Sequence, residues 1–169
     1  MADDRYPFHH RSEVDVGTDA HSLFALLDDH RRLAAHMEKP SLMMAGATMR
    51  VETDALKGQA VGSLIRVTGR VLGLDLAVDE VVTERVPALR KTWETQGEPR
   101  LLVIGSYRMG FTITAREDRS RLVVFIDYQL PPRGFAHALG WIFGRAYAAW
   151  CTRRMAADAV AAFTVVAAS

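Results

Sequence analysis

The chain of 169 residues is 49% apolar and 24% charged, which is typical of one globular domain and excludes a disordered chain. Its net charge of +1 excludes a general attraction to nucleic acid or acidic membranes, so no nucleic-acid partner is expected. The single cysteine, Cys151, excludes an intrachain disulfide, and no apolar run reaches the ~18 residues of a membrane-spanning helix. We therefore expect a cytoplasmic protein without stable membrane insertion.

The first part of the chain predicts an arm, a short strand and two short helices. Residues 1–11 form the flexible N-terminal arm, and residues 12–169 form a single domain. Residues 13–16 are predicted as a strand. Thr18 is the predicted N-cap of a first helix, and a second short helix is predicted over residues 29–37.

Six further strands are predicted between residues 49 and 130, because apolar and polar residues alternate there. Short polar turns separate them, which favours an antiparallel meander over a parallel sheet. Gly73 is the predicted bend of the third of these strands, and residues 97–100 are a predicted turn. The predicted strands cover residues 49–53, 63–68, 71–84, 89–95, 101–115 and 121–130.

An alanine-rich stretch from Gly134 to Val165 predicts one long helix. Its apolar residues recur at a period of 3.6, which predicts the face that packs on the sheet. Trp141 lies opposite this stripe, where it is either an isolated surface residue or a dimer or membrane contact. The stripe consists of Phe135, Leu139, Ile142, Phe143, Ala146, Trp150, Ala157, Ala161 and Thr164.

The predicted fold class is therefore α+β. A curved antiparallel sheet of about seven strands, with two short helices after the first strand, wraps around the long C-terminal helix.

Four parts of the chain carry a resemblance to a known superfamily: residues 14–29, residues 61–66, residues 81–87 leading to Trp93, and the terminal helix. In these parts the chain resembles the START-like superfamily, also called SRPBCC, of lipid-transfer domains, birch-pollen-allergen-type proteins and polyketide cyclases. The resemblance implies a helix-grip fold with a cavity between sheet and helix. It implies a small apolar ligand there: a lipid, a quinone or an aromatic polyketide-like molecule. None of the four parts contains a catalytic motif.

Aromatic and apolar residues on the predicted inner faces are the candidate ligand-binding residues. Alternation fits a filled core as well as a lined cavity, and the resemblance favours the cavity. Gly105 and Gly110 remove side-chain volume from one strand, which also favours open space. The candidates are Trp93, Tyr107, Met109, Phe111 and Tyr128 on the strands, and Leu139, Phe143, Tyr147 and Trp150 on the helix.

Three charged residues, Arg66, Glu80 and Glu94, lie on strands near the expected cavity. Because charged side chains are rarely buried, the simpler interpretation places all three on the outer face, in water. A carboxylate that faced inward would have a raised pKa and would suit acid or base catalysis. If the protein is an enzyme, the candidate catalytic residues are Arg66, Glu94 and Tyr107, which could polarise a carbonyl group or move a proton.

The sequence contains no motif for a metal site, a catalytic nucleophile or a nucleotide cofactor. The six histidines lack the spacing of a zinc signature, so no metal is expected. A nucleophile elbow, a phosphate loop and a dinucleotide fingerprint are missing, so no cofactor is expected either.

Three functions stay open. Binding or carriage of a small apolar ligand is favoured, because the inner surface is aromatic and no catalytic set accompanies it. The alternatives are a cyclase or dehydratase that uses polar cavity residues, and a domain that modulates a larger complex through its surface. The sequence leaves the oligomeric state open.

Overall fold

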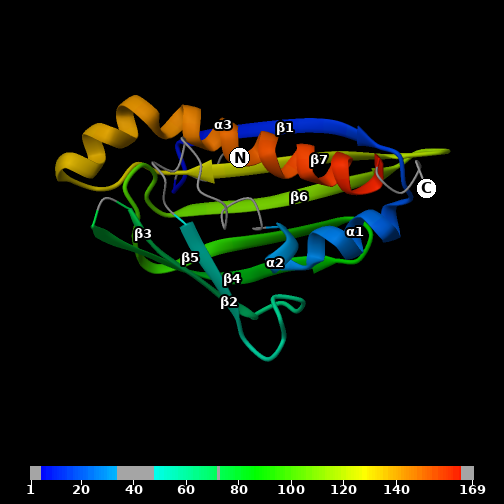
Figure 1. Cartoon of the computed structure of the whole chain (residues 1–169), viewed down its shortest axis with the longest axis horizontal. Helices are drawn as coiled ribbons and strands as arrows, with labels where there is room; N and C mark the ends of the chain where they lie inside the picture. Colours follow the sequence, from blue (N-terminus) through cyan, green and yellow to red (C-terminus); the bar gives the residue numbers. More distant parts are fainter. Residues whose placement is uncertain (1–4, 34–47, 72, 165–169) are drawn as a thin grey trace.

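The computed structural model describes residues 5–33, 48–71 and 73–164 (Figure 1). Three helices are present in these ranges: α1 (Ala20–Asp28), α2 (His30–Leu33) and α3 (Gly134–Thr164). The strands are β1 (Phe8–Val16), β2 (Thr48–Thr53), β3 (Leu64–Val71), β4 (Leu74–Val86), β5 (Arg90–Arg100), β6 (Tyr107–Ala115) and β7 (Ser120–Tyr128).

All strand pairs are antiparallel and build one seven-stranded sheet in the order β1-β7-β6-β5-β4-β3-β2. Consecutive strands from β2 to β7 are neighbours, and β1 joins the far edge beside β7. Helix α3 runs along the sheet and packs against β1 and β7 (Figure 1). The predicted helix-grip architecture is therefore confirmed.

The core lies between the inner face of the sheet and the helices. Alternate residues of β6 and β7 point into it, as their sequence pattern predicts. Phe111, Ile113, Leu122, Val124 and Ile126 are each at most 3% exposed. Among the described residues, no helix combines the length and apolar character needed to cross a membrane.

The N-terminal part differs from the prediction in two places. The first strand begins at Phe8, which pairs with Tyr128, so residues 8–11 belong to the sheet and not to an arm. Asp19, not Thr18, caps α1: its carboxylate accepts hydrogen bonds from the backbone N–H groups of His21 and Ser22, at 2.9 and 3.0 Å. Most of the second predicted helix, beyond Leu33, lies outside the described residues.

The boundaries between β3 and β6 also differ. Gly73 (φ +81°) lies in the turn between β3 and β4 and does not bend a strand. Strand β5 continues through the predicted turn to Arg100, which pairs with Ala77. Residues 101–106 form a loop instead of a strand. The loop packs on the end of β7, where the Gly105 N–H donates to the Gln129 carbonyl at 2.7 Å.

Helix α3 has the predicted extent but not the predicted orientation. Phe135, Ile142 and Phe143 are 74%, 67% and 51% exposed, so the predicted inward stripe is wrong. A Cβ at Gly140 would lie 2.7 Å from the carbonyl oxygen of Val103, so the helix backbone packs directly on the 101–106 loop. That close approach leaves room only for small residues on the inner face. The buried residues are Gly140, Gly144, Ala148, Cys151, Thr152, Met155, Ala156 and Ala159.

The remaining residues of the predicted stripe are not fully buried either. Leu139 and Trp150 are half-buried, whereas Ala146, Ala157, Ala161 and Thr164 are exposed. Trp141, expected off the stripe, is 76% exposed.

Candidate functional site

An apolar cavity of about 80 Å³ lies between the inner face of the sheet and α3. A single water needs roughly 10–15 Å³, and typical ligand pockets measure about 300–1,000 Å³. The cavity therefore has room for a molecule of about one aromatic ring. It is lined by His30, Met49, Val51, Val67, Val78, Glu80, Trp93, Leu101, Ile104, Tyr107, Met109, Ile126, Tyr147, Cys151 and Met155.

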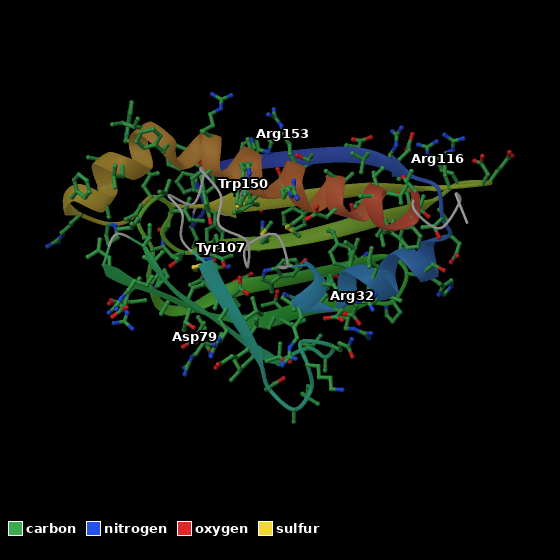
Figure 2. All side chains as sticks on the ribbon, in the orientation of Figure 1. Arg32, Asp79, Tyr107, Arg116, Trp150 and Arg153 are labelled. Carbon is green, nitrogen blue, oxygen red and sulfur yellow. The ribbon has the colours of Figure 1, made fainter. Side chains whose placement is uncertain are left out.

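Four of the candidate ligand-binding residues line this cavity: Trp93 from β5, Tyr107 and Met109 from β6, and Tyr147 from α3. Figure 2 shows Tyr107 in the region between the sheet and α3. The inward alternation of β5 and β6 brings the three strand residues together, and Tyr147 meets them from the helix.

The other strand candidates are buried but do not line the cavity. Phe111 packs edge-on against Phe24 and Trp93, with ring centroids 5.8 and 6.4 Å apart. Tyr128 stacks on Phe8 at 5.5 Å. Both side chains belong to the filled core, which was the alternative interpretation of their alternation.

The remaining helix candidates also lie outside the cavity wall. Phe143 is half exposed to solvent and Leu139 is half-buried on the outer side, because the helix is rotated relative to the prediction. Trp150 packs against the ring of Tyr147 at 5.9 Å, behind the wall.

The polar side of the cavity is built from Glu80 on β4 and Tyr107 at the start of β6. The Tyr107 hydroxyl donates a short hydrogen bond to Oε1 of Glu80, and both side chains are buried. Burial raises the pKa of Glu80 to about 7, although hydrogen bonds from Tyr107 and Trp93 and the charge of Lys91 act in the opposite direction. Burial and the neighbouring carboxyl group raise the pKa of Tyr107 well above its usual value. Near neutral pH the pair therefore contains one carboxyl group that can hold or release a proton.

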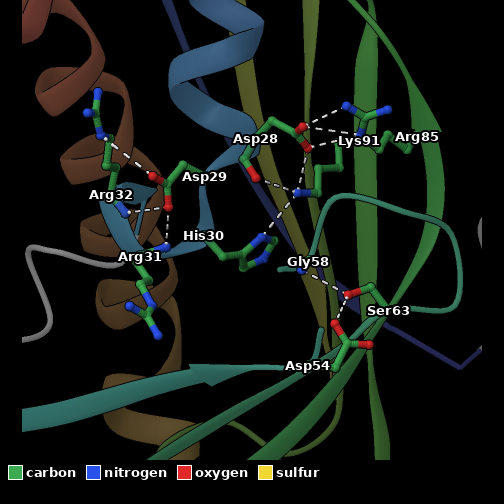
Figure 3. A network of polar contacts seen from close by, with 10 residues as sticks. All are labelled: Asp28, Asp29, His30, Arg31, Arg32, Asp54, Gly58, Ser63, Arg85 and Lys91. Atoms are coloured by element: carbon green, nitrogen blue, oxygen red, sulfur yellow. Dashed lines mark hydrogen bonds and ion pairs between the residues drawn. The ribbon is translucent and has the colours of Figure 1, made fainter. Parts of the chain in front are cut away.

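A buried ion cluster lies next to His30, one of the residues that line the cavity (Figure 3). The ammonium group of Lys91, which is 0% exposed, donates to the Asp28 carboxylate at 2.8 Å and to the Asp28 carbonyl at 2.9 Å. Arg85 donates to the same carboxylate at 2.7 Å. Burial alone would raise the pKa of Asp28, but the hydrogen bonds from Arg85 and Lys91 outweigh it and lower the pKa. The cluster therefore holds Asp28 as a carboxylate.

His30 connects this cluster to the cavity. Its Nδ1 lies 3.2 Å from the Lys91 ammonium group, which can only donate, so Nδ1 is the acceptor and Nε2 carries the proton. Burial and the charge of Lys91 lower the pKa of His30 to about 3, so the ring is neutral. Nε2 is buried and has no hydrogen-bond partner among the described residues. The ring packs edge-on against Trp93 at 4.7 Å, in the cavity wall.

On the α3 side, Cys151 and Tyr147 close the wall. Burial raises the pKa of the Cys151 thiol to about 12, although its hydrogen bond with Tyr147 acts in the opposite direction. The thiol is therefore protonated at neutral pH and contributes an apolar surface.

Two candidate catalytic residues, Arg66 and Glu94, lie on the outer face of the sheet. The Arg66 guanidinium pairs with Asp79 at 2.7 Å, and both side chains are largely exposed; Figure 2 shows Asp79 at the outer surface. Glu94 lies 3.9 Å from Arg5, on the opposite face of β5 from Trp93. Neither residue lines the cavity, so Tyr107 is the only one of the three candidates that does. Glu80, in contrast, points inward, and its expected outward position is wrong.

The described part of the chain holds no group of three or more His, Cys, Asp or Glu side chains placed to bind a metal ion.

Comparison with known proteins identifies the fold. No protein-family model and no curated protein matches the chain. Norcoclaurine synthase from Thalictrum flavum superposes with a TM-score of 0.64 at 15% identity, covering 96% of each chain. The Zhui aromatase/cyclase from Streptomyces sp. R1128 superposes with a TM-score of 0.62 at 16% identity, covering 92% of this chain and 90% of that one. The structure of Ara h 8.0201 gives 0.56 at 11% identity, covering 91% and 98%.

The chain has the START-like helix-grip fold. At these identities the comparisons establish the architecture and leave the chemistry to the residues of this chain. In this helix-grip domain the polar residues around the cavity include Glu80, Tyr107 and His30, with Lys91 in contact with His30.

Of these four residues, Glu80 was expected near the cavity but on the outer face, and Lys91 and His30 were not predicted as cavity residues. Strand parity contained a signal for Glu80 and Lys91. Glu80 shares the face of Val78 and Val82, which are 4% and 1% exposed. Lys91 shares the face of Trp93. Burial preferences alone put both charges in water, and the partners that make burial tolerable come from distant segments. His30 had no such periodic signal.

Proposed function

We propose that the protein binds a small, mainly apolar molecule of about one aromatic ring that carries an oxygen able to accept a hydrogen bond. The observation that carries the proposal is the Nε2–H group of buried His30, which has no hydrogen-bond partner among the described residues and lies in the wall of a mainly apolar cavity. A buried donor without a partner costs about 1–3 kcal/mol, which a ligand oxygen would recover.

The size of the cavity selects among the expected ligand classes. A long-chain lipid exceeds about 80 Å³ many times over, whereas a phenol, a benzaldehyde or a simple quinone is close to that size. Norcoclaurine synthase, which shares the fold, has been solved in complex with dopamine and hydroxybenzaldehyde, two single-ring aromatic compounds. This supports a single-ring aromatic ligand here.

The polar groups suit such a ligand at two points. His30 donates to a carbonyl or hydroxyl oxygen of the ligand. Glu80 forms a hydrogen bond with a second polar substituent, as donor when protonated and as acceptor when ionised. Trp93 and Tyr147 supply aromatic surface between these points. A ligand with two oxygens on one ring therefore complements the cavity better than a hydrocarbon.

Native mass spectrometry of the purified protein, followed by extraction of what co-purifies, is the first test. The second is calorimetric titration with 4-hydroxybenzaldehyde of two matched β4 variants. Val78→Phe fills the cavity, whereas Val81→Phe adds the same volume on the other face of the strand. We expect Val78→Phe to abolish binding and Val81→Phe to retain it, with unchanged circular dichroism in both.

Equal binding by the two variants would place the ligand elsewhere. An empty protein that also fails to bind a hydrophobic fluorescent probe would contradict the proposal and favour a function exerted through the surface of the domain.

A second candidate function, proton-transfer catalysis of the cyclase or dehydratase type, is favoured by the Glu80–Tyr107 pair. A carboxyl group with a pKa of about 7 is matched to general acid–base work near neutral pH. If the molecule that co-purifies is turned over, Glu80→Gln should retain its binding and lose the product. If the wild-type protein returns the molecule unchanged, catalysis is contradicted and ligand binding is the remaining function.

A further inference from the structure

The first turns of α3 present an exposed apolar surface. We define the α3 apolar surface as Phe135, Trp141, Ile142 and Phe143, which are 74%, 76%, 67% and 51% exposed. Ten large apolar side chains of the described residues are exposed, and these four fall within nine consecutive positions. Single exposed apolar residues are ordinary, but a concentrated set marks a contact surface.

The surface is confined to one half of the helix. Further along α3, the exposed positions are small or charged: Ala146, Arg153, Arg154, Ala157 and Ala161. The exposed side of this later part of α3 is therefore an ordinary solvated face. The change from aromatic to alanine and arginine within one helix shows that only its first part is suited to an apolar environment.

The aromatic side chains cannot turn toward the sheet. Gly140 and Gly144 occupy the inner face, and Cβ atoms added there would lie 2.7 and 3.4 Å from the carbonyl oxygen of Val103. Rotating α3 to bury Phe143 would push a large side chain into this backbone contact. The orientation of the surface is therefore fixed by close packing.

The charge around this surface is positive. Between Asp127 and Asp158 the sequence has four arginines and no acidic residue, although the chain as a whole carries only +1. Arg133 and Arg145 flank the α3 apolar surface, are exposed, and form no ion pair with another described residue. Unpaired arginines beside exposed aromatic residues are complementary to a surface that is apolar inside and anionic outside.

A second copy of the chain complements this surface less well. A two-fold interface over this surface would bury Arg133 and Arg145 of both copies, with no carboxylate from this part of the helix to pair with them. The phosphates of anionic lipids supply that charge, and the region below the headgroups accepts aromatic side chains.

We propose that the α3 apolar surface docks the protein on an anionic lipid bilayer, with the helix lying in the plane of the interface. Phe135, Trp141 and Ile142 enter the boundary between headgroups and acyl chains, and Arg133 and Arg145 contact lipid phosphates. The inference is independent of the ligand proposed above, because it uses none of the cavity residues.

Co-sedimentation of the full chain with vesicles tests the proposal directly. The wild-type protein should pellet with vesicles of phosphatidylglycerol and phosphatidylcholine, and much less with phosphatidylcholine alone. Arg133→Ser/Arg145→Ser should weaken binding by about fivefold for each arginine. The control Arg11→Ser/Arg116→Ser removes two exposed arginines elsewhere and should bind nearly as the wild type does.

The apolar contribution is tested in the same assay. Trp141→Ser/Ile142→Ser should abolish sedimentation, whereas Leu56→Ser/Val61→Ser, a control at two exposed positions in the turn before β3, should not. Trp141 is also an internal probe, because it is 76% exposed, whereas Trp93 is 3% exposed and Trp150 is half-buried. Its fluorescence should shift to the blue when anionic vesicles are added.

Failure of the wild-type protein to bind anionic vesicles overturns the proposal, as does equal binding to both vesicle types. A dimer in analytical ultracentrifugation that Trp141→Ser/Ile142→Ser dissociates, without vesicle binding, would show that the surface joins two copies instead.

Discussion

Replacing Glu80 by glutamine should change how the stability of the protein depends on pH. In the folded protein the Glu80 carboxyl group has a pKa of about 7, because burial disfavours its charged form. In the unfolded chain a glutamate ionises near 4.3. Between these values the unfolded chain has released the proton and the folded protein still holds it, so the free energy of unfolding falls as pH rises.

The magnitude follows from the width of that window. Each pH unit costs about 1.4 kcal/mol, so the contribution of Glu80 is fully present below about pH 4 and roughly 3–4 kcal/mol of it is lost by pH 7. Glutamine keeps the shape and stays neutral. The Glu80→Gln variant should therefore gain roughly that much relative to the wild type as the pH rises from 4.5 to 7.5.

Urea denaturation at intervals across this range measures the difference in unfolding free energy between the two proteins. Taking the difference removes the contribution of all other titrating groups. Glu52→Gln, on the exposed face of β2, is the control and should run parallel to the wild type. A Glu80→Gln variant that also runs parallel to the wild type, or that loses relative stability with rising pH, would refute the assignment of a buried, largely protonated Glu80.

Three further predictions concern the frame of the cavity. Asp28→Asn leaves the fully buried Lys91 ammonium without its carboxylate and should lower the free energy of unfolding in urea by about 3–5 kcal/mol. The double variant Asp28→Asn/Lys91→Met should recover most of this loss, and a loss below about 1 kcal/mol in Asp28→Asn would contradict the prediction. Gly110→Ala should cost about 2 kcal/mol or more, because its Cβ would overlap the Lys91 carbonyl oxygen, whereas Gly17→Ala, with open space around it, should be nearly neutral. Cys151, with a thiol pKa of about 12 and 7% exposure, should resist a disulfide reagent in the native protein and react once urea unfolds it, and rapid native labelling would contradict its placement.

Most of the fold could be predicted because it depends on local patterns. Alternation located the strands, and polar turns between them indicated an antiparallel order, which the register of β6 and β7 confirms. The predicted strand boundaries were wrong where contacts between residues far apart in the sequence determine the structure. The strand β1 extends back to Phe8 because β7 offers a partner as far as Tyr128, and residues 101–106 leave the sheet because they pack on the end of β7 and on α3.

The cavity residues were only partly predictable for a related reason. Aromatic residues on inner faces were found by parity, but parity cannot separate Tyr107, which lines the cavity, from Phe111, which fills the core. The buried charges were harder still. Lys91 is tolerable inside only because Asp28, 63 positions away in sequence, meets it at the end of α1, and no local pattern reports that meeting.

The rotation of α3 connects the two proposals in physical terms. A period of 3.6 locates an apolar stripe on a helix, and the stripe is expected to face the core because burial of large apolar groups is favourable. Here backbone packing at Gly140 takes precedence and presents small residues inward. The aromatic residues displaced from the interior form the α3 apolar surface, and the cavity keeps its volume because Cys151 and Met155, instead of Phe143 and Trp150, complete its wall. A Gly140→Leu variant should therefore disturb both at once, weakening vesicle binding and ligand binding together, whereas Trp141→Ser should weaken only the first.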